Sequence, residues 1–158
     1  MATSHKLPVV QCTQLLQTKL LQVGFQPADY VTYFAEWKRD CKVNPIVEFT
    51  DYYFGKDGEY SRPKRNGKNI LWHVHLPPKS KSAEIARWEY DLKHKARKKS
   101  NTSLIYAYDL TNGYLLIDIV WEPDGHSLTK MNTPASKELM EGYADIAEQF
   151  ITYGIVLV

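Results

Sequence analysis

The chain has 158 residues, of which 44% are hydrophobic and 24% charged. This length suits one globular domain with a hydrophobic core and is too short to expect two. No stretch approaches the roughly 18 to 20 consecutive apolar residues of a membrane-spanning helix, and the opening MATSHKLPVV lacks the pattern of a secretory signal. We therefore expect a cytoplasmic protein with no membrane partner. The two cysteines, Cys12 and Cys41, show no CxxC spacing and are expected to be buried thiols rather than zinc ligands or a disulfide framework.

Charge is distributed unevenly along the chain, although the formal net charge is only +2. Residues 56–99 contain thirteen Lys or Arg against five Asp or Glu, whereas the rest of the chain contains seven against thirteen. This asymmetry indicates that one surface meets a polyanion such as a phosphate chain, and that another could meet a basic partner. A lysine-rich surface that only keeps the protein soluble is the alternative.

The first two predicted elements lie before residue 45. Residues 9–23, VVQCTQLLQTKLLQV, carry apolar residues irregularly and fit either a strand that turns at Gly24 or a short helix; we favour the strand. Residues 26–45 give a clearer signal, because Pro27 suits a first helical turn and apolar residues recur three and four positions apart. This pattern predicts an amphipathic helix that ends before Asn44, with an apolar stripe formed by Tyr30, Phe34, Trp37 and Cys41.

The basic middle of the chain begins with a segment rich in turn-forming residues. Residues 51–69 contain three glycines, a proline and clustered charge, and are predicted to form an exposed loop rather than a strand or helix. The apolar run ILWHVHLPP follows at residues 70–78. If this run is a strand, its period of two places His73 and His75 on the same face.

The next elements are a short helix and a hairpin. Residues 83–92 have helical propensity, and the basic tract at residues 93–99 is predicted to be a mobile cationic loop. Residues 103–110 and 113–122 are apolar and aromatic runs joined by Asn-Gly, the strongest short hairpin signal. In the second strand, strict alternation would place three side chains on one face: Leu116, Asp118 and Val120.

The last predicted helix begins after Thr133, which can cap it, with Pro134 at its first position. Residues 151–158 could end the chain as a short strand. Strands and helices in this order predict an α+β domain, in which a small antiparallel sheet packs with helices. The expected apolar stripe of the last helix is Leu139, Tyr143, Ile146 and Phe150.

Two conventional interpretations of the HxH pair remain open. A metal site needs a third and usually a fourth ligand, for which His126 and Asp118 are candidates, but HExxH and CxxC motifs are absent. A packing role needs only that one imidazole faces the core while the other is exposed. Neither interpretation uses the basic segments that surround the pair.

A third interpretation connects the histidines with the charge pattern. Metal-free RNA cleavage requires a group that takes the 2′-hydroxyl proton, a group that protonates the leaving 5′ oxygen, and cations that stabilise the phosphate. Histidine titrates near neutral pH and can serve both proton transfers. Basic loops would hold phosphates, and Trp72, Tyr106 or Tyr108 could stack on unpaired bases, although both tyrosines could instead be core residues.

Six segments of the chain form a recognisable series: YFAEWKRD (33–40), FGKDGEY (54–60), WHVHLP (72–77), SLIYAYD (103–109), YLLIDIVWEPDGH (114–126) and YADIAEQF (143–150). Together they resemble the YafO family of bacterial type II toxins, over about residues 30–150. The resemblance implies a RelE-like toxin domain over residues 1–158, with a variable N-terminal segment over about residues 1–25. It further implies a protein without cofactors that enters the ribosome, cuts translated messenger RNA and is silenced by a cognate antitoxin.

The family pattern extends to particular residues of this chain, but the family alone fixes no catalytic residue, so the roles that follow are our own inference. His75 and His126 would serve as general base and general acid, in either order, with His73 beside them on the strand. Tyr108 would orient the reacting groups through its hydroxyl, and Asp118 would fix an imidazole tautomer if it faces the same side. The motif also includes the loop Phe54-Gly55-Lys56-Asp57, and Glu122 and Pro123 after the hairpin.

Glu122 is either a turn residue paired with a lysine or a catalytic group. Two other function classes stay open for the whole chain: a nucleic-acid-binding or protein-binding module without catalysis, and a metal-dependent hydrolase. In the nuclease, phosphates of messenger or ribosomal RNA would bind seven cations: Lys56, Arg62, Lys64, Arg65, Arg97, Lys98 and Lys99.

Overall fold

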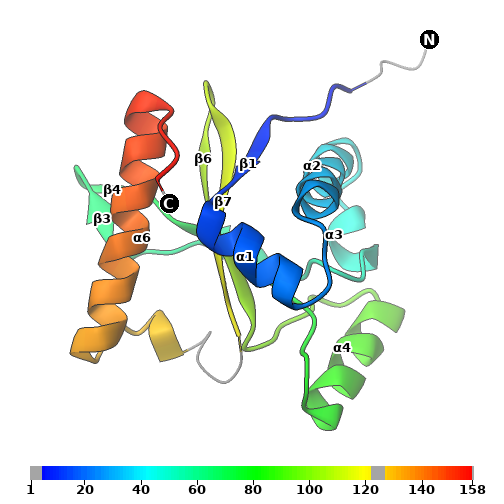
Figure 1. Ribbon diagram of the computed structural model, residues 1–158. Coiled ribbons are helices and arrows are strands. Elements are labelled where there is room, and N and C mark those ends of the chain that lie inside the picture. Colours follow the sequence, from blue (N-terminus) through cyan, green and yellow to red (C-terminus); the bar gives the residue numbers. More distant parts are fainter. Residues whose placement is uncertain (1–4, 122–126, 158) are drawn as a thin grey trace.

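The computed structural model describes residues 5–121 and 127–157, which form a five-stranded sheet with helices on both faces (Figure 1). Neighbouring strands are antiparallel except β1 and β7, which are parallel. The predicted α+β class is therefore confirmed, with one parallel pair at the edge of the sheet. In sheet order the strands are β1 (Val10–Cys12), β7 (Gly113–Val120), β6 (Ser103–Asp109), β5 (Trp72–His75) and β2 (Asp57–Glu59).

Helices on the two faces of the sheet create two separate hydrophobic clusters. Helix α6 (Pro134–Tyr153) packs on one face, and α1 (Gln14–Gln22) and α2 (Pro27–Val43) pack on the other (Figure 1). The α6 face and the α2 face are named after these helices below. Two further helices, α3 (Val47–Thr50) and α4 (Ser82–Lys93), lie outside this sandwich. Within the described chain, no helix has the length and apolar character needed to cross a membrane.

Helix α2 confirms the predicted helix and most of its apolar stripe. Tyr30, Phe34 and Trp37 are buried against the sheet. Both cysteines are free, as expected, but they are half-buried rather than buried. Partial burial still raises the pKa of each thiol to about 12, because desolvation disfavours the thiolate.

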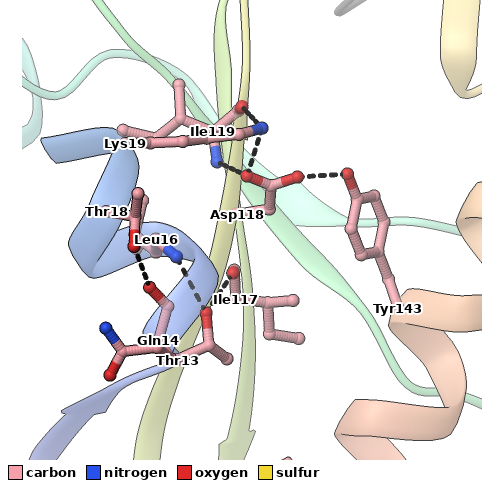
Figure 2. Close-up of polar contacts among 9 residues, drawn as sticks. All are labelled: Thr13, Gln14, Leu16, Thr18, Lys19, Ile117, Asp118, Ile119 and Tyr143. Carbon is pink, nitrogen blue, oxygen red and sulfur yellow. Dashed lines mark hydrogen bonds and ion pairs between the residues drawn. The ribbon is translucent and has the colours of Figure 1, made fainter. Parts of the chain in front are cut away.

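Residues 9–23 contain both structures that the sequence left open, so the preference for a strand alone was wrong. Strand β1 is followed at once by α1, and Thr13 makes the change of direction. Its hydroxyl accepts a hydrogen bond from the Leu16 amide (3.2 Å) as the helix N-cap and donates one to the Ile117 carbonyl (2.6 Å), as Figure 2 shows. Leu16 and Leu20, one turn apart, are fully buried beneath the helix.

The β6–β7 hairpin is confirmed, but its second strand does not alternate as predicted. Ile105 pairs with Asp118 and Tyr106 pairs with Leu116, so a bulge lies at Ile117. One extra residue shifts every following side chain to the opposite face. Leu116 therefore belongs to the α2 face, whereas Asp118 reaches α6 by a hydrogen bond from Tyr143 (Figure 2).

Residues 51–69 are not the exposed loop that the glycines and charges indicated. They contain β2, which pairs with β5, and the separate hairpin of β3 (Lys64–Arg65) and β4 (Lys68–Asn69). Phe54 and Tyr60 are buried on opposite faces of the sheet. Gly55 is required here, because a Cβ at this position would lie 2.4 Å from the Lys98 carbonyl oxygen. These short strands carry too few residues for a periodic signal.

Helix α4 confirms the predicted short helix, but the basic tract after it is not a free cationic loop. The Lys98 side chain is 0% exposed, and its ammonium group donates to the Glu48 carbonyl (3.3 Å) above the Trp88 ring. Burial lowers the pKa of Lys98. The Lys98 carbonyl also accepts from the Lys56 amide (2.8 Å), so the tract is fixed to the loop before β2.

Helix α6 begins as predicted, with Thr133 and Ser136 forming a reciprocal capping box and Pro134 at the first position. Tyr143 and Phe150 of the predicted stripe are buried, but Leu139 is 44% exposed and Met140 is buried in its place. The helix ends at Gly154, which has a positive φ. The described residues after it, 155–157, form no strand, so that prediction was wrong.

Candidate active site

A surface pocket of about 650 Å³ opens on the α6 face where β5 meets β2 and the segment after α4. Five separated stretches of the described chain line it: residues 56–62, the histidines of β5, two residues of α4 (Glu84 and Arg87), residues 99–103, and Thr129. The predicted period of two holds, since His73 pairs with Ile105 and His75 pairs with Ser103 on the neighbouring strand. The two imidazole rings lie 5.6 Å apart, centroid to centroid, at this pocket.

The backbone of Ser100 holds one ring nitrogen of His75. The Nδ1 atom lies 2.9 Å from the Ser100 amide nitrogen and 2.8 Å from the Ser100 carbonyl oxygen. The amide donates to Nδ1 when that atom carries no proton, and the carbonyl accepts from it when it does. Ser100 is itself held, since its hydroxyl accepts from the Thr102 amide (3.1 Å). Both the neutral ring and the imidazolium of His75 are therefore supported in place.

His73 has a different environment, although it belongs to the same strand and the same face. Its ring stacks on Tyr60, with centroids 4.0 Å apart and planes 7° from parallel. Its Nδ1 atom is buried and meets no hydrogen-bond partner in the described part of the chain. Burial, assisted by the nearby His75, lowers the pKa of His73 to about 4. His73 is therefore neutral at physiological pH.

The pocket carries an excess of positive charge. Lys56 reaches it from the loop before β2, where its carbonyl accepts from the His75 amide (2.9 Å). Arg62 is anchored by a hydrogen bond from its guanidinium to the Lys130 carbonyl (2.8 Å). The described lining contains four Lys or Arg, namely Lys56, Arg62, Arg87 and Lys99, against two acids, Glu59 and Glu84.

Four of the predicted phosphate-binding residues do not line this pocket, and contacts elsewhere in the fold hold them. Arg65 forms ion pairs with three acidic residues of α6: Glu141, Asp145 and Glu148. Arg97 lies 3.6 Å from a Glu48 carboxylate oxygen, and Lys98 is buried. Lys64 donates to the Asn69 side chain across the small hairpin (2.6 Å). These four side chains therefore form ion pairs or hydrogen bonds within the protein. The charge pattern of the sequence did not separate them from the cations that line the pocket.

Tyr108 lies far from the histidines. It is on the α2 face, where its ring contacts Tyr114, and it is five residues along β6 from the residue paired with His75. At about 3.3 Å per residue, this separation is about 16 Å along the strand. The hydroxyl of Tyr108 therefore does not orient groups at the pocket.

Asp118 does face the α6 side, but its carboxylate contacts other groups than the imidazoles. Its oxygens bind the Lys19 ammonium (2.7 Å), the Ile119 amide (2.8 Å) and the Tyr143 hydroxyl (2.5 Å), as Figure 2 shows. The Nδ1 atom of His75 instead contacts the Ser100 backbone. The predictions for Glu122, Pro123 and His126 lie outside the described residues.

Sequence reasoning missed three contributors to the pocket: Tyr60, Arg87 and Ser100. Tyr60 lies in the segment that we interpreted as a loop, so its stacking on the strand was not anticipated. Arg87 occupies α4 and Ser100 follows the basic tract, and nothing in their local sequence indicates a site. In the described ranges, no three His, Cys, Asp or Glu side chains gather as ligands of one metal ion.

Comparisons with known proteins give one result. The sequence model of one protein family, described as toxin YafO of type II toxin-antitoxin systems, matches residues 35–152. No curated protein and no solved structure matches the chain. The matched range starts inside α2, so it includes the described residues of the histidine pocket and excludes β1 and α1.

Proposed function

The chain belongs to the YafO toxin family of type II toxin-antitoxin systems, which implies a cognate antitoxin, and from this premise we propose that it is an endoribonuclease. It cuts messenger RNA that is being translated on the ribosome and thereby inhibits translation in the cytoplasm. The α+β architecture, with antiparallel strands between helices, is compatible with the RelE-like type of microbial ribonuclease that this proposal assumes.

One observation carries the proposal: a histidine whose Nδ1 atom is supported in both protonation states lies in the same pocket as several cations. The Ser100 carbonyl can hold a proton on Nδ1 of His75, and we assign proton exchange with RNA to the Nε2 atom. Lys56 and Lys99 line the same pocket and supply positive charge for a phosphate. These residues supply one proton-transfer group and the cations, two of the three components that metal-free cleavage of RNA needs.

The reaction is an internal transfer at phosphorus. A general base removes the 2′-hydroxyl proton while the 2′ oxygen forms a bond to the phosphorus atom, and the bond from phosphorus to the 5′ oxygen breaks. A general acid gives a proton to that leaving oxygen, so the products are a 2′,3′-cyclic phosphate and a 5′-hydroxyl. His75 performs one of these proton transfers and His126 the other. The lysines stabilise the additional negative charge on the phosphoryl oxygens.

His73 has a positioning role in this mechanism. An imidazole with a pKa of about 4 stays neutral and is a weak base at the pH of the cytoplasm. Its stacking on Tyr60 ties β5 to the end of β2 and fixes the strand from which His75 projects. The neutral ring also avoids a second positive charge next to His75.

Purified ribosomes programmed with a defined messenger test the proposal, with primer extension to locate new 5′ ends. The wild-type chain is expected to produce cuts in the translated region, and His75→Ala is expected to slow cutting by about 10²- to 10⁴-fold. The matched control is His94→Ala, because His94 is exposed at the C-cap of α4, outside the pocket. Thermal unfolding of each variant separates loss of chemistry from loss of folding.

Other results would favour the alternative functions. Translation arrest without new 5′ ends would identify a binding module that blocks the ribosome and would overturn the nuclease. A chelator selective for transition metals spares the Mg²⁺ that ribosomes need. Loss of cutting in that chelator, restored by added zinc, would replace the acid and base assignment with metal-dependent hydrolysis.

A further inference from the structure

A second surface pocket, of about 410 Å³, lies on the α2 face at the opposite end of β6 from the histidines. The segment before β1, the C-terminal half of α2 and the turn between β6 and β7 form its walls. The proposed cleavage reaction uses none of these residues. The pocket is nevertheless assembled from distant parts of the chain, which makes it a candidate for a binding role.

Close backbone contact fixes the N-terminal wall of this pocket to the hairpin. The Tyr114 amide donates to the Val9 carbonyl (2.9 Å), and β1 continues this contact as a parallel strand. Gly113 permits the approach, because it has a φ of +83° and a Cβ there would lie 2.3 Å from the Val9 carbonyl oxygen. The pocket is therefore held between ordered elements.

Tyr108 offers an aromatic surface at this pocket. Its side chain is 39% exposed, and its ring lies 4.6 Å from that of Tyr114, centroid to centroid, with the planes 35° apart. Tyr114 contacts the buried rings of Phe34 and Tyr106 in turn. The exposed tyrosine thus rests on a fixed aromatic base, and a planar ligand could stack on it with little loss of side-chain freedom.

Positive charge surrounds this aromatic surface. The described lining of the pocket contains no Asp or Glu. It contains four basic residues: Lys6, Lys38, Arg39 and Lys42. Two of them are engaged, since Lys38 pairs with Asp57 and Arg39 with Asp40. Lys6 and Lys42 are exposed and lie on opposite walls, one before β1 and the other at the end of α2.

An exposed aromatic ring beside exposed ammonium groups is the chemistry that recognises an unpaired nucleotide. We propose that this pocket binds one unpaired nucleotide of RNA, with its base on Tyr108 and its phosphate near Lys42 and Lys6. The proposal rests on the proposed function, because it adds a second RNA contact to the same toxin. Tyr108 is about 16 Å along the strand from the residue paired with His75 and on the other face, so the pocket anchors RNA and takes no part in the cleavage step.

Binding of a fluorescein-labelled octamer of uridine to the purified full-length chain tests this site at low salt. Tyr108→Ala is expected to weaken binding about tenfold, whereas Tyr108→Phe keeps the ring and is expected to bind like the wild type. Lys42→Ala is expected to weaken binding and to reduce the slope of log affinity against log salt by about 0.7. Tyr153→Ala removes another exposed tyrosine, outside the pocket, and serves as the matched control.

The source of the nucleotide is resolved by a photoreactive residue. Replacing Tyr108 with p-benzoylphenylalanine and irradiating programmed ribosomes is expected to attach the chain to RNA, and sequencing that RNA distinguishes messenger from ribosomal RNA. Attachment to ribosomal proteins alone would overturn the proposal. So would no measurable binding of the octamer by the wild type, or unchanged affinity in both Tyr108→Ala and Lys42→Ala.

Failure of this proposal is distinguishable from failure of the proposed function. A chain that cuts messenger RNA but binds the octamer equally well after both substitutions has the nuclease activity without this pocket. A chain that binds the octamer through Tyr108 but produces no new 5′ ends has the nucleotide pocket without the nuclease. The binding and cleavage measurements therefore judge the two proposals separately.

Discussion

Two polar regions on the α6 face, around Asp118 and around His75, differ in the protein contacts that surround the central side chain. Asp118 is 2% exposed, and its carboxylate binds an ammonium, an amide and a hydroxyl from three elements. His75 is half-buried, and its Nδ1 atom contacts a backbone amide and carbonyl that accommodate either protonation state. In the first region, protein groups surround a carboxylate that stays charged. In the second, the imidazole can gain or lose a proton and keep its contact with Ser100.

This difference separates residues that stabilise the fold from residues that are suited to chemistry. A buried charged group whose partners are all protein atoms has little capacity for a ligand, and its removal destabilises the fold because those partners are left unpaired. A titratable group beside cations that line a pocket can exchange protons with a bound molecule. The same distinction applies to the cations, since Arg65 is paired with α6 while Lys99 lines the histidine pocket.

The largest expected effect is the loss of RNA cleavage when His75 is replaced. His75→Ala should reduce cleavage on ribosomes by about 10²- to 10⁴-fold, because it removes one proton-transfer group. The unfolding midpoint should change little compared with the loss of activity. A variant that retains wild-type cleavage would show that His75 is a packing residue, as the second interpretation of the HxH pair holds.

The next largest effect is expected on stability, when Asp118 is removed from its contacts with Lys19 and Tyr143. Asp118→Ala should lower the free energy of unfolding by about 3 kcal/mol, because Lys19 and Tyr143 lose their shared partner in a buried site. Urea denaturation measures this change. The control is Glu138→Ala, an exposed position of α6 that is expected to stay within about 0.5 kcal/mol of the wild type. Equal effects at both positions would mean that the network contributes nothing beyond a surface charge.

A third prediction concerns pH and the stacked histidine. The pKa of His73 is lowered to about 4 in the folded chain, so between about pH 6.5 and 4 the unfolded chain binds a proton that the folded chain does not. Stability from this group is therefore present above about pH 6.5 and is lost as the pH falls towards 4. After allowance for partial exposure, the loss is on the order of 2 kcal/mol.

His73→Phe sharpens this prediction, because it keeps a ring against Tyr60 that cannot gain a proton. Urea denaturation at about pH 7.5 and about pH 4.5 should show a smaller loss of stability in the variant than in the wild type, by the amount given above. An identical pH dependence in the two chains would mean that the buried ring does not resist protonation.

The smallest effects compare a cation of the pocket with a cation of the fold. Lys99→Ala should weaken RNA binding a few fold and reduce its salt slope by about 0.7, because one phosphate contact is lost. Arg65→Ala should leave the salt slope unchanged and lower stability by about 1 kcal/mol, since its guanidinium is paired with acids of α6. A reduced slope in Arg65→Ala would place phosphate on the small hairpin instead.

Periodicity predicted the elements that have a long, one-sided apolar pattern. The stripe of α2, the capping of α6 by Thr133 and the Asn-Gly hairpin all follow from local residue preferences, and the structure has each of them. The same periodicity placed His73 and His75 on one face of β5. It could not predict that the two rings differ, because alternation along a strand specifies the face to which a side chain points and not the residues that surround it there.

The remaining features depend on contacts between segments that are far apart in the sequence. Tyr60 and Ser100 determine that His73 is buried and neutral while His75 is held by a carbonyl and an amide. The bulge at Ile117 turns Asp118 towards α6, and a one-residue shift of this kind leaves no local signal.

The amino-acid sequence alone determined the α+β class, the main helices and hairpin, the basic middle segment and the resemblance to the toxin family, because these depend on local preferences and on the order of motifs. Only the tertiary structure decided which charged side chains are held by contacts within the fold. Lys98 is buried and Lys99 lines a pocket, although they are neighbours in one basic tract. The free energy of a charge depends on the partners and solvent around it, and these are fixed only when distant segments pack together.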